Sequence, residues 1–240
     1  MMSWVPERRR SLELIDLPEG YSRPEFAGNL ADIRLVNRFL GAYRVVLTNI
    51  SALLRGMTSS AESPVRMLDV ATGSSDIPVA IVKWARQQGI AVAITAVDKN
   101  HLAVSVAADI ARPYPEIVVM EADGFSLPYK DASFDIVLCS QTLHHFNEAD
   151  AVKILREINR VAAFGYFIMD RRRSRFAWLL ISALTRIFSR NRLTRHDGPM
   201  SMLRSYTVAE LSALSDKAGL TNREIVRKPF WLMVLSGKKV

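Results

Sequence analysis

The sequence predicts an α/β fold: a doubly wound sheet of seven strands, mostly parallel, with an antiparallel last strand. Two observations carry this prediction. Between residues 66 and 170, short apolar or β-branched runs alternate with runs of helical periodicity, which is typical of parallel sheets with right-handed crossovers. Two further strand-like runs end the chain around a Lys228-Pro229 corner, which favours a hairpin.

An arm and two helices are expected before the sheet. Prolines and a glycine interrupt residues 1–27, which we interpret as irregular. Apolar residues recur at helical spacing over residues 29–55, with a break or bend near Gly41. We therefore assign residues 1–64 to an N-terminal arm with lid helices, and residues 65–240 to the main domain.

The main domain is expected to alternate strands and helices up to residue 170. A basic, helix-rich insertion over residues 171–206 follows, with a loop at 196–204, and Thr207 and Glu210 form a capping box for the last helix. The expected strands are residues 66–70, 93–98, 117–121, 134–140, 165–170, 221–228 and 230–236. The expected helices of this domain outside the insertion are residues 77–88, 103–111, 149–161 and 207–218.

Size and cysteine content restrict the class of protein. The 240 residues are 49% hydrophobic, enough to bury one full core. The N-terminus shows no apolar signal-peptide core. The longest apolar run, near residues 176–184, is far shorter than the roughly 20 residues that span a bilayer. Cys139 is the single cysteine, so no internal disulfide can form, and we expect a cytoplasmic location.

The loop after the first expected strand is the strongest functional signal. Residues 65–76 read VRMLDVATGSSD, so an apolar run ends at Asp69 and breaks into small residues around Gly73. Nucleotide-like ligands bind at such strand–loop–helix turns. A second strand ends at Asp98, whose carboxylate can accept hydrogen bonds from both hydroxyls of a ribose. A loop with one glycine suits an adenosyl ligand without phosphate better than a pyrophosphate.

Four motifs in order resemble those of the class I S-adenosylmethionine-dependent methyltransferases. They are LDVATGSS at 68–75, AVDKN at 96–100, EADGFSLP at 121–128 and FDIVLCSQTLHHF at 134–146. Within this class the chain is most similar to the branch of quinone-biosynthesis and small-molecule (polyketide, phenol) methyltransferases. The resemblance implies a Rossmann-like fold, with S-adenosylmethionine as cofactor and S-adenosylhomocysteine as product. We expect no metal.

The resemblance also implies which residues bind the cofactor. Ala71 and Gly73 would leave room beside the methionine moiety, whose ammonium group Asp69 would serve. Asp98 would hold the ribose, and Asp123 would accept from the adenine amino group. The full expected set is Asp69, Ala71, Gly73, Ser75, Asp98, Lys99, Asp123, Gly124, Phe125, Ser140 and Gln141.

Two positions of the first loop depart from the family pattern. Ala71 and Ser75 stand where the family usually has glycines. Alanine is tolerable at the first position if its φ is negative. The side chain of Ser75 would crowd the packing between loop and helix and weaken cofactor affinity.

Histidines are the candidate catalytic bases. Methyl transfer to oxygen is helped by a base with a pKa near 7. His144 and His145 follow the fourth expected strand, at the sheet edge where open α/β sheets bind ligands. His196, beside Asp197, lies in the insertion, where this superfamily often builds its acceptor pocket. The alternatives are structural: the histidine pair shapes its loop, and Asp197 belongs to a turn.

The positive charge is concentrated in one segment. Residues 171–195 hold eight arginines and no acid, which leaves 24 basic and 24 acidic residues elsewhere. The helix expected here has one apolar side, formed by Phe176, Leu180, Ala183, Leu184 and Ile187. Such a helix can cover an apolar pocket, which we favour, or contact an anionic membrane or an acidic carrier protein. Nucleic acid is disfavoured, because few aromatic residues are interleaved to stack on bases.

We therefore expect a methyltransferase for a small, apolar, hydroxylated acceptor such as a polyketide, a phenol or a quinone-like compound. Oxygen is favoured over carbon as the methyl acceptor. One alternative is a non-catalytic protein of the same fold that binds a carrier protein or a membrane through residues 171–195. A weaker alternative is a nucleic-acid methyltransferase.

Overall fold

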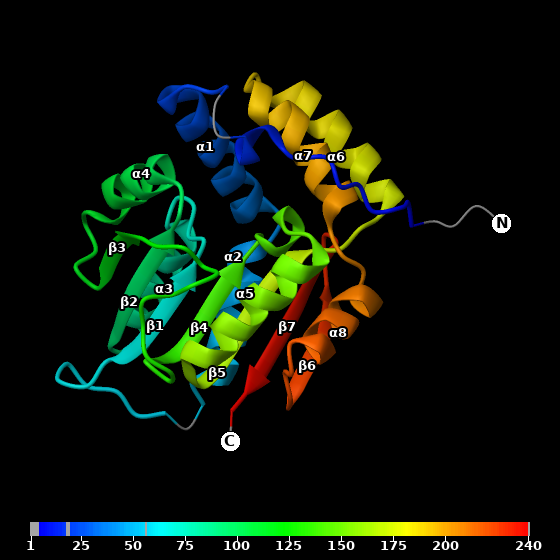
Figure 1. The fold of residues 1–240 in the computed structure, drawn as a ribbon. Helices are drawn as coiled ribbons and strands as arrows, with labels where there is room; N and C mark the ends of the chain where they lie inside the picture. Colours follow the sequence, from blue (N-terminus) through cyan, green and yellow to red (C-terminus); the bar gives the residue numbers. More distant parts are fainter. Residues whose placement is uncertain (1–4, 18–19, 56, 240) are drawn as a thin grey trace.

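A seven-stranded sheet runs through the protein in the computed structural model, which describes residues 5–17, 20–55 and 57–239 (Figure 1). The strand order is β3-β2-β1-β4-β5-β7-β6. The first five strands pair in parallel, and β7 is antiparallel to both of its neighbours, as predicted. The strands are β1 (Val65–Val70), β2 (Val92–Asp98), β3 (Ile117–Glu121), β4 (Phe134–Ser140), β5 (Ala162–Arg171), β6 (Arg223–Lys228) and β7 (Leu232–Lys238).

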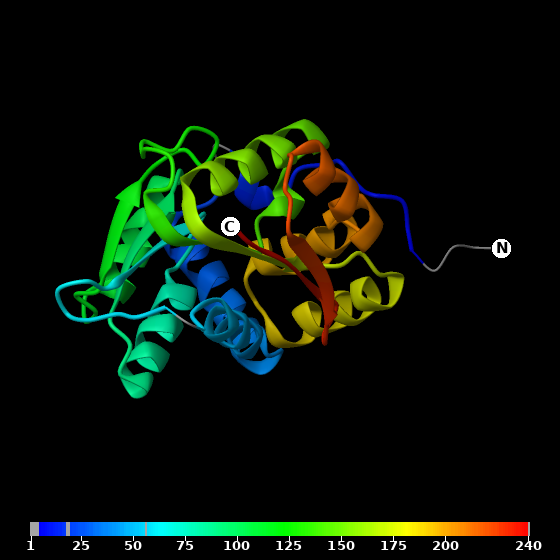
Figure 2. The ribbon, with the colours of Figure 1, turned by 90° about the horizontal axis from the view of Figure 1, so that it is seen from below.

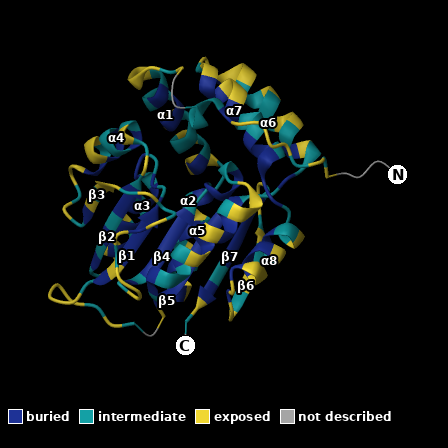
Figure 3. Cartoon of the chain, viewed as in Figure 1, coloured by how far each residue is buried: buried dark blue, intermediate teal, exposed yellow. Residues whose placement is uncertain are grey.

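Helices cover both faces of the sheet (Figure 2). One face carries α2 (Ala42–Leu53), α3 (Asp76–Gln88) and α4 (His101–Ala111), and the other carries α5 (Glu148–Val161) and α8 (Val208–Lys217). Alternate side chains of a strand pack in opposite cores. Met67 packs in the core on the face covered by α2 and α3, and Leu68 packs in the core on the face covered by α5 and α8. The central strands are buried on both faces, which explains their nearly continuous apolar sequences (Figure 3).

A layer of helices stands over the carboxyl end of the sheet. It contains the 3₁₀ turn Leu14–Asp16 and the helices α1 (Arg23–Phe39), α6 (Arg175–Phe188) and α7 (Arg192–Arg204) (Figure 1). Gly41, with a φ of +73°, separates α1 from α2, which confirms the predicted break. None of the described helices is long and apolar enough to cross a bilayer.

Helix α1 begins earlier than predicted, inside the segment expected to be irregular. The Ser22 hydroxyl accepts a hydrogen bond from the backbone N–H of Glu25 and so caps the helix. Pro24 lies in the first turn, where a helix tolerates proline because the N–H there has no partner within the helix. Pro24 therefore marks a helix start and not a continuing loop.

The prediction of a loop at residues 196–204 is wrong, because this segment belongs to α7. Asn191 caps the helix, and Leu193 and Met202 are buried on its inner side. Gly198 is a packing residue: a Cβ at this position would lie 2.9 Å from Cγ2 of Thr185 on α6. The Gly-Pro pair looks like a turn in the sequence, but here it allows two helices to approach closely.

This packing predicts that Gly198→Ala destabilises the fold although alanine favours helices. Overpacking costs roughly 1–3 kcal/mol, more than the roughly 1 kcal/mol that alanine gains over glycine in a helix. We expect a net loss of about 1 kcal/mol in the free energy of unfolding, measured by urea denaturation. In a Thr185→Ser background, which removes the contacting methyl group, Gly198→Ala should be stabilising. If Gly198→Ala alone raised the free energy of unfolding of the wild-type protein, this result would contradict the close packing.

Candidate active site

A cavity of about 1550 Å³ lies at the carboxyl ends of β1, β2 and β4, beneath the layer of helices. The order of the strands reverses between β1 and β4, and open α/β sheets bind their ligands at such a point. The cavity exceeds the roughly 300–1000 Å³ of an ordinary small-molecule pocket. It has room for two ligands side by side.

Asp69, at the end of β1, lines the cavity, and only one of its two carboxylate oxygens accepts a hydrogen bond from a described residue. Its Oδ2 accepts a hydrogen bond from the Thr72 hydroxyl at 2.7 Å. Its Oδ1 is buried and receives no hydrogen bond from any described residue. Burial raises the pKa of Asp69 to about 7, although the hydrogen bond from Thr72 opposes the shift. A cation placed beside Oδ1 would stabilise the ionised form.

The loop after β1 has a strained backbone. The φ angles of Ala71, Gly73 and Ser75 are +57°, +57° and +55°, so the condition of a negative φ at Ala71 is not met. This left-handed region is open to glycine but costs other residues roughly 1–2 kcal/mol. Ser75 is fully buried, does not line the cavity, and places its Oγ 3.2 Å from the Thr72 hydroxyl. The Ser75 side chain therefore packs inside the protein and supports the loop, and it does not face the cavity.

Asp98, at the end of β2, is fixed by backbone donors. Its Oδ2 accepts from the N–H of Gly73 at 3.0 Å, and its Oδ1 accepts from the N–H of Asn100 at 2.9 Å. Burial raises the pKa of Asp98, although these two hydrogen bonds oppose the shift. Each oxygen keeps a lone pair for a further donor, such as a ribose hydroxyl. Lys99 also lines the cavity.

The motif after β3 forms another wall of the cavity. Asp123, Gly124 and Phe125 all line it, and the Asp123 carboxylate accepts from the N–H of Phe125 at 2.9 Å. A Cβ at Gly124 would lie 3.1 Å from Val70 and 3.2 Å from Ile154, so the packing leaves little room for a side chain at this position. The Phe125 ring meets Phe146 edge-on, with 4.9 Å between ring centroids.

Ser140, the last residue of β4, and Gln141, which follows it, both line the cavity. The Ser140 hydroxyl is buried without a described partner. The Gln141 side chain donates to Asn37 on α1 at 2.6 Å and accepts from Arg171 at 2.9 Å. Asn37 in turn donates to Asp76, at the start of α3. Sequence reasoning missed Asn37, which lies outside every motif, and the role of Asp76, the last residue of the first loop, because only the folded chain brings them to Gln141.

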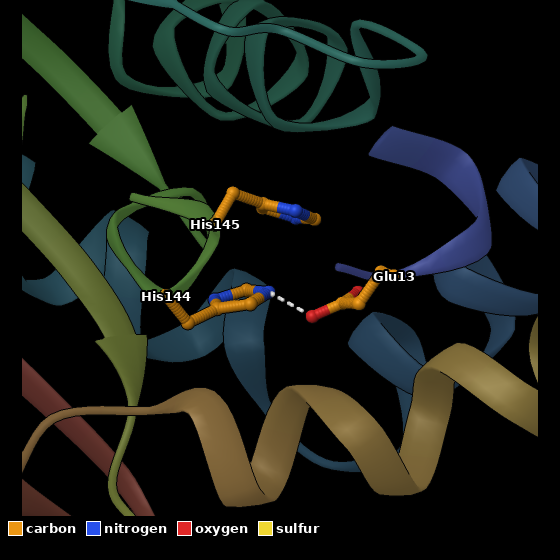
Figure 4. Close-up of side chains that lie close together, drawn as sticks. All are labelled: Glu13, His144 and His145. Atoms are coloured by element: carbon orange, nitrogen blue, oxygen red, sulfur yellow. Dashed lines mark ion pairs between the residues drawn. The ribbon is translucent and has the colours of Figure 1, made fainter. Parts of the chain in front are cut away.

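His144 and His145 are neighbours in the 3₁₀ turn Leu143–His145, with their rings tilted by 35° and 4.3 Å between ring centroids. His144 is buried, and its Nδ1 lies 2.7 Å from Asp170. On its other side, Nε2 lies 3.9 Å from the carboxylate of Glu13 (Figure 4). Burial would raise the pKa of Asp170, but the charge and hydrogen bond of His144 outweigh it and lower that pKa.

His145 lines the cavity and keeps part of its surface exposed. Its Nδ1 lies 2.7 Å from Asp16, and 22% of its side chain is accessible. Burial would lower the pKa of His145, but the carboxylates of Glu13 and Asp16 outweigh it and raise that pKa. Nothing in the sequence pointed to these two acids, since they lie 129 or more residues before the histidine.

His196 does not join this group. It lies on α7, is not among the residues that line the cavity, and has 43% of its side chain exposed. Its Nδ1 lies 2.7 Å from Asp197. That carboxylate also accepts from the backbone N–H groups of Leu14 and Ile15, at 2.7 and 3.0 Å. Asp197 therefore anchors the N-terminal segment to α7 instead of orienting a base toward a ligand.

Glu13, His144 and His145 have potential metal-binding atoms that lie within 4.8 Å of one another. The guanidinium of Arg204 lies beside these residues. Its Nε lies 3.6 Å from the Glu13 carboxylate, and its Nη1 lies 3.1 Å from the Asp16 carboxylate. Arg204 also donates to the backbone carbonyls of both histidines. We interpret the cluster as a charge network around the histidines, and the expected absence of a metal stays a prediction.

The strained loop predicts that Ala71→Gly stabilises the protein. Removing the Cβ relieves the left-handed strain, and the larger entropy of an unfolded glycine offsets part of this gain. We expect the free energy of unfolding to rise by about 0.5–1 kcal/mol. As a control, Ala80→Gly in the interior of α3 should lower it by about 1 kcal/mol. If both substitutions lowered the free energy of unfolding, the inference of backbone strain at Ala71 would be contradicted.

Comparisons with known proteins find similarity to methyltransferases. Residues 68–169 match the model of the methyltransferase domain family. A demethylmenaquinone methyltransferase of Lysinibacillus sphaericus (strain C3-41) is 26% identical over 104 residues, which are 43% of this chain and 42% of that protein. The matched part thus spans less than half the length of that curated relative.

Solved structures extend the likeness beyond the matched domain. A SAM-dependent methyltransferase from Aquifex aeolicus has a TM-score of 0.65 and 16% identity, over 92% of this chain and 100% of that one. The magnesium protoporphyrin IX methyltransferase of Synechocystis PCC 6803, solved with bound S-adenosylhomocysteine, has a TM-score of 0.57 and 15% identity, over 83% and 84%. At these identities the likeness shows the fold. Residues 68–169 therefore form a methyltransferase domain, and they hold the four motifs that resemble those of the class I S-adenosylmethionine-dependent methyltransferases.

Proposed function

We propose that this protein transfers a methyl group from S-adenosylmethionine to a hydroxyl oxygen of a small apolar acceptor. The observation that carries the proposal is a single cavity with a polar end and an apolar end. Asp69, Asp98 and Ser140, at the ends of β1, β2 and β4, form the polar end, and the contact of His145 with Asp16 joins the edge of the sheet to the layer of helices above it. The single cysteine, Cys139, is buried and free, which supports a reducing cytoplasm as its location.

The residues of the polar end fit the cofactor. The Oδ1 of Asp69, to which no described residue donates a hydrogen bond, suits an ammonium group, and the remaining lone pairs of Asp98 suit ribose hydroxyls. Asp123, Gly124 and Phe125 form the wall where an adenine ring would lie. When bound, the cofactor supplies an electrophilic methyl group on a sulfonium. We infer that Gln141, held by Asn37 and Arg171, borders this methyl group.

The apolar end fits a hydroxylated hydrocarbon. Side chains from three helices of the upper layer and from β7 line it. They include Val36, Leu40, Ile181, Leu184, Met202 and Leu232. A phenol, a polyketide or a quinone-like compound would bury its apolar part here and present its oxygen toward the polar end. The similarity to a demethylmenaquinone methyltransferase favours acceptors of this kind.

His145 is the proposed base. With Nδ1 held by Asp16, Nε2 is the nitrogen left to accept the proton of the acceptor hydroxyl. Asp16 would then stabilise the imidazolium, while the bound cofactor would supply its methyl group to the acceptor oxygen. His144, buried between Asp170 and Glu13, is a positioning residue that holds the turn carrying His145.

Cofactor affinity should rise with pH through the titration of Asp69. Its pKa of about 7 without ligand means that the carboxyl group is neutral below this pH and must lose its proton to bind an ammonium group. Calorimetric titration with S-adenosylmethionine should therefore show the association constant falling up to about tenfold per pH unit below 7. Asp69→Asn should bind more weakly and lose this pH dependence. Identical pH profiles for the two proteins would sink the assignment.

Methyl transfer should rise with pH as His145 loses its proton, with an apparent pKa above the ordinary 6.5 of histidine, because the neighbouring acids raise it. His145→Gln should reduce kcat by about 10²–10⁴-fold, and Asp16→Asn should shift the rise to lower pH. The assay uses labelled S-adenosylmethionine with a panel of alkylphenols and hydroxyquinones. His196→Gln is the control and should leave kcat unchanged. Full activity of His145→Gln would exclude this base.

A further inference from the structure

Exposed apolar side chains gather around the mouth of the cavity. Eight of the twelve large hydrophobic residues that are exposed in the described chain lie on the C-terminal half of α1, on α6 and on the β6–β7 turn. Four of them both line the cavity and face solvent: Leu35, Phe39, Phe188 and Phe230. We call these three elements the mouth face. Figure 2 shows α6 in yellow and the red β6–β7 turn close together on one side of the molecule.

Helix α6 has more apolar surface than the cavity can cover. Ile181, Leu184 and Phe188 line the cavity. The stripe expected to cover the pocket instead points largely outward: Phe176, Ile187 and Leu180 are 57%, 71% and 38% exposed. Leu179, beside this stripe, is 54% exposed. Isolated exposed hydrophobic residues are ordinary, but a cluster at the mouth of a cavity marks a binding surface.

The charge of the mouth face is mainly positive. Residues 33–53, 171–196 and 225–239 contain no aspartate or glutamate. Asp32, in the C-terminal half of α1, accepts hydrogen bonds from the hydroxyls of Ser189 and Thr194. Several arginines of these segments already bind within the protein, as Arg171 and Arg173 do. Arg38, Arg186 and Arg190 are exposed, and their side chains make no hydrogen bond or ion pair with any described residue. Apolar side chains flanked by free arginines are typical of helices that lie in the interface of an anionic membrane.

We propose that the mouth face docks on an anionic lipid bilayer, so that the cavity opens toward the lipid. Helix α6, with 14 residues and a length of about 21 Å, would lie in the plane of the membrane. An apolar acceptor would then enter without crossing water, a part of the proposal that rests on the proposed function. A second copy of the chain is a poor occupant, because a symmetric interface would bring the same cations together.

Vesicle co-sedimentation tests the docking without cofactor or acceptor. Vesicles with about 30% phosphatidylglycerol should retain the protein, and pure phosphatidylcholine vesicles should retain much less, with binding falling as salt rises. Leu179→Ser/Ile187→Ser should lower the partition coefficient about tenfold or more. Arg186→Gln/Arg190→Gln should lower it about twentyfold, since each arginine near an anionic surface contributes roughly fivefold. None of these four residues lines the cavity.

A matched control lies at the opposite sheet edge. Val118 and Met120 on β3 are 56% and 42% exposed, so Val118→Ser/Met120→Ser should leave the partition coefficient unchanged. Thermal unfolding of each variant checks that the fold is intact. Methyl transfer to a water-soluble phenol should survive in the α6 variants, which separates failure of docking from failure of the enzymatic proposal.

Three results would overturn the proposal. The first is no retention of the wild type on anionic vesicles at low salt. The second is retention that the apolar pair of substitutions leaves unchanged, which would indicate a purely electrostatic contact of the kind an acidic protein makes. The third is a dimer in light scattering that the same apolar substitutions dissociate, which would make the mouth face an interface between two copies.

Discussion

The hydrogen bond from the Gly73 backbone to the Asp98 carboxylate joins the two strand ends on which the site depends. It connects the left-handed loop after β1 to the end of β2, so the groups expected to contact the methionine and ribose parts of the cofactor are positioned together. The strain at Ala71 and Ser75 persists because this bond, the contact between the Thr72 and Ser75 hydroxyls and the start of α3 hold the loop from several sides. Preorganisation of this kind reduces the entropy lost when a ligand binds.

A second set of constraints comes from the N-terminal segment. Asp197 on α7 accepts hydrogen bonds from the backbone of Leu14 and Ile15, which fixes the turn that carries Asp16 to His145. Arg204, at the end of the same helix, binds Asp16 and the carbonyls of both histidines. The charge state of the proposed base therefore depends on residues from both ends of the chain. This group of charges is costly to rearrange, since removing one partner leaves another uncompensated.

Helix α6 has two apolar sides with different roles. The inner side closes the cavity, and the outer side remains in solvent next to free arginines. A helix that served only as a lid would need one apolar stripe and a polar outer surface. The width of the apolar arc connects the layer of helices, the cavity beneath it and the surface through which an apolar compound could enter.

The sequence by itself determined the order of strands and helices, the antiparallel last strand and the acids that end β1 and β2. Local apolar periodicity and short motifs carry these features, and the parallel sheet brings the strand ends together. Only the tertiary structure decided that Gly198-Pro199 lies within a helix, that the φ of Ala71 is positive, and that His145 is paired whereas His196 is remote. Each of these depends on packing or charge contacts between segments far apart in the chain. Local sequence cannot encode such contacts, because the same residues would satisfy several alternative folds of the arm and the insertion.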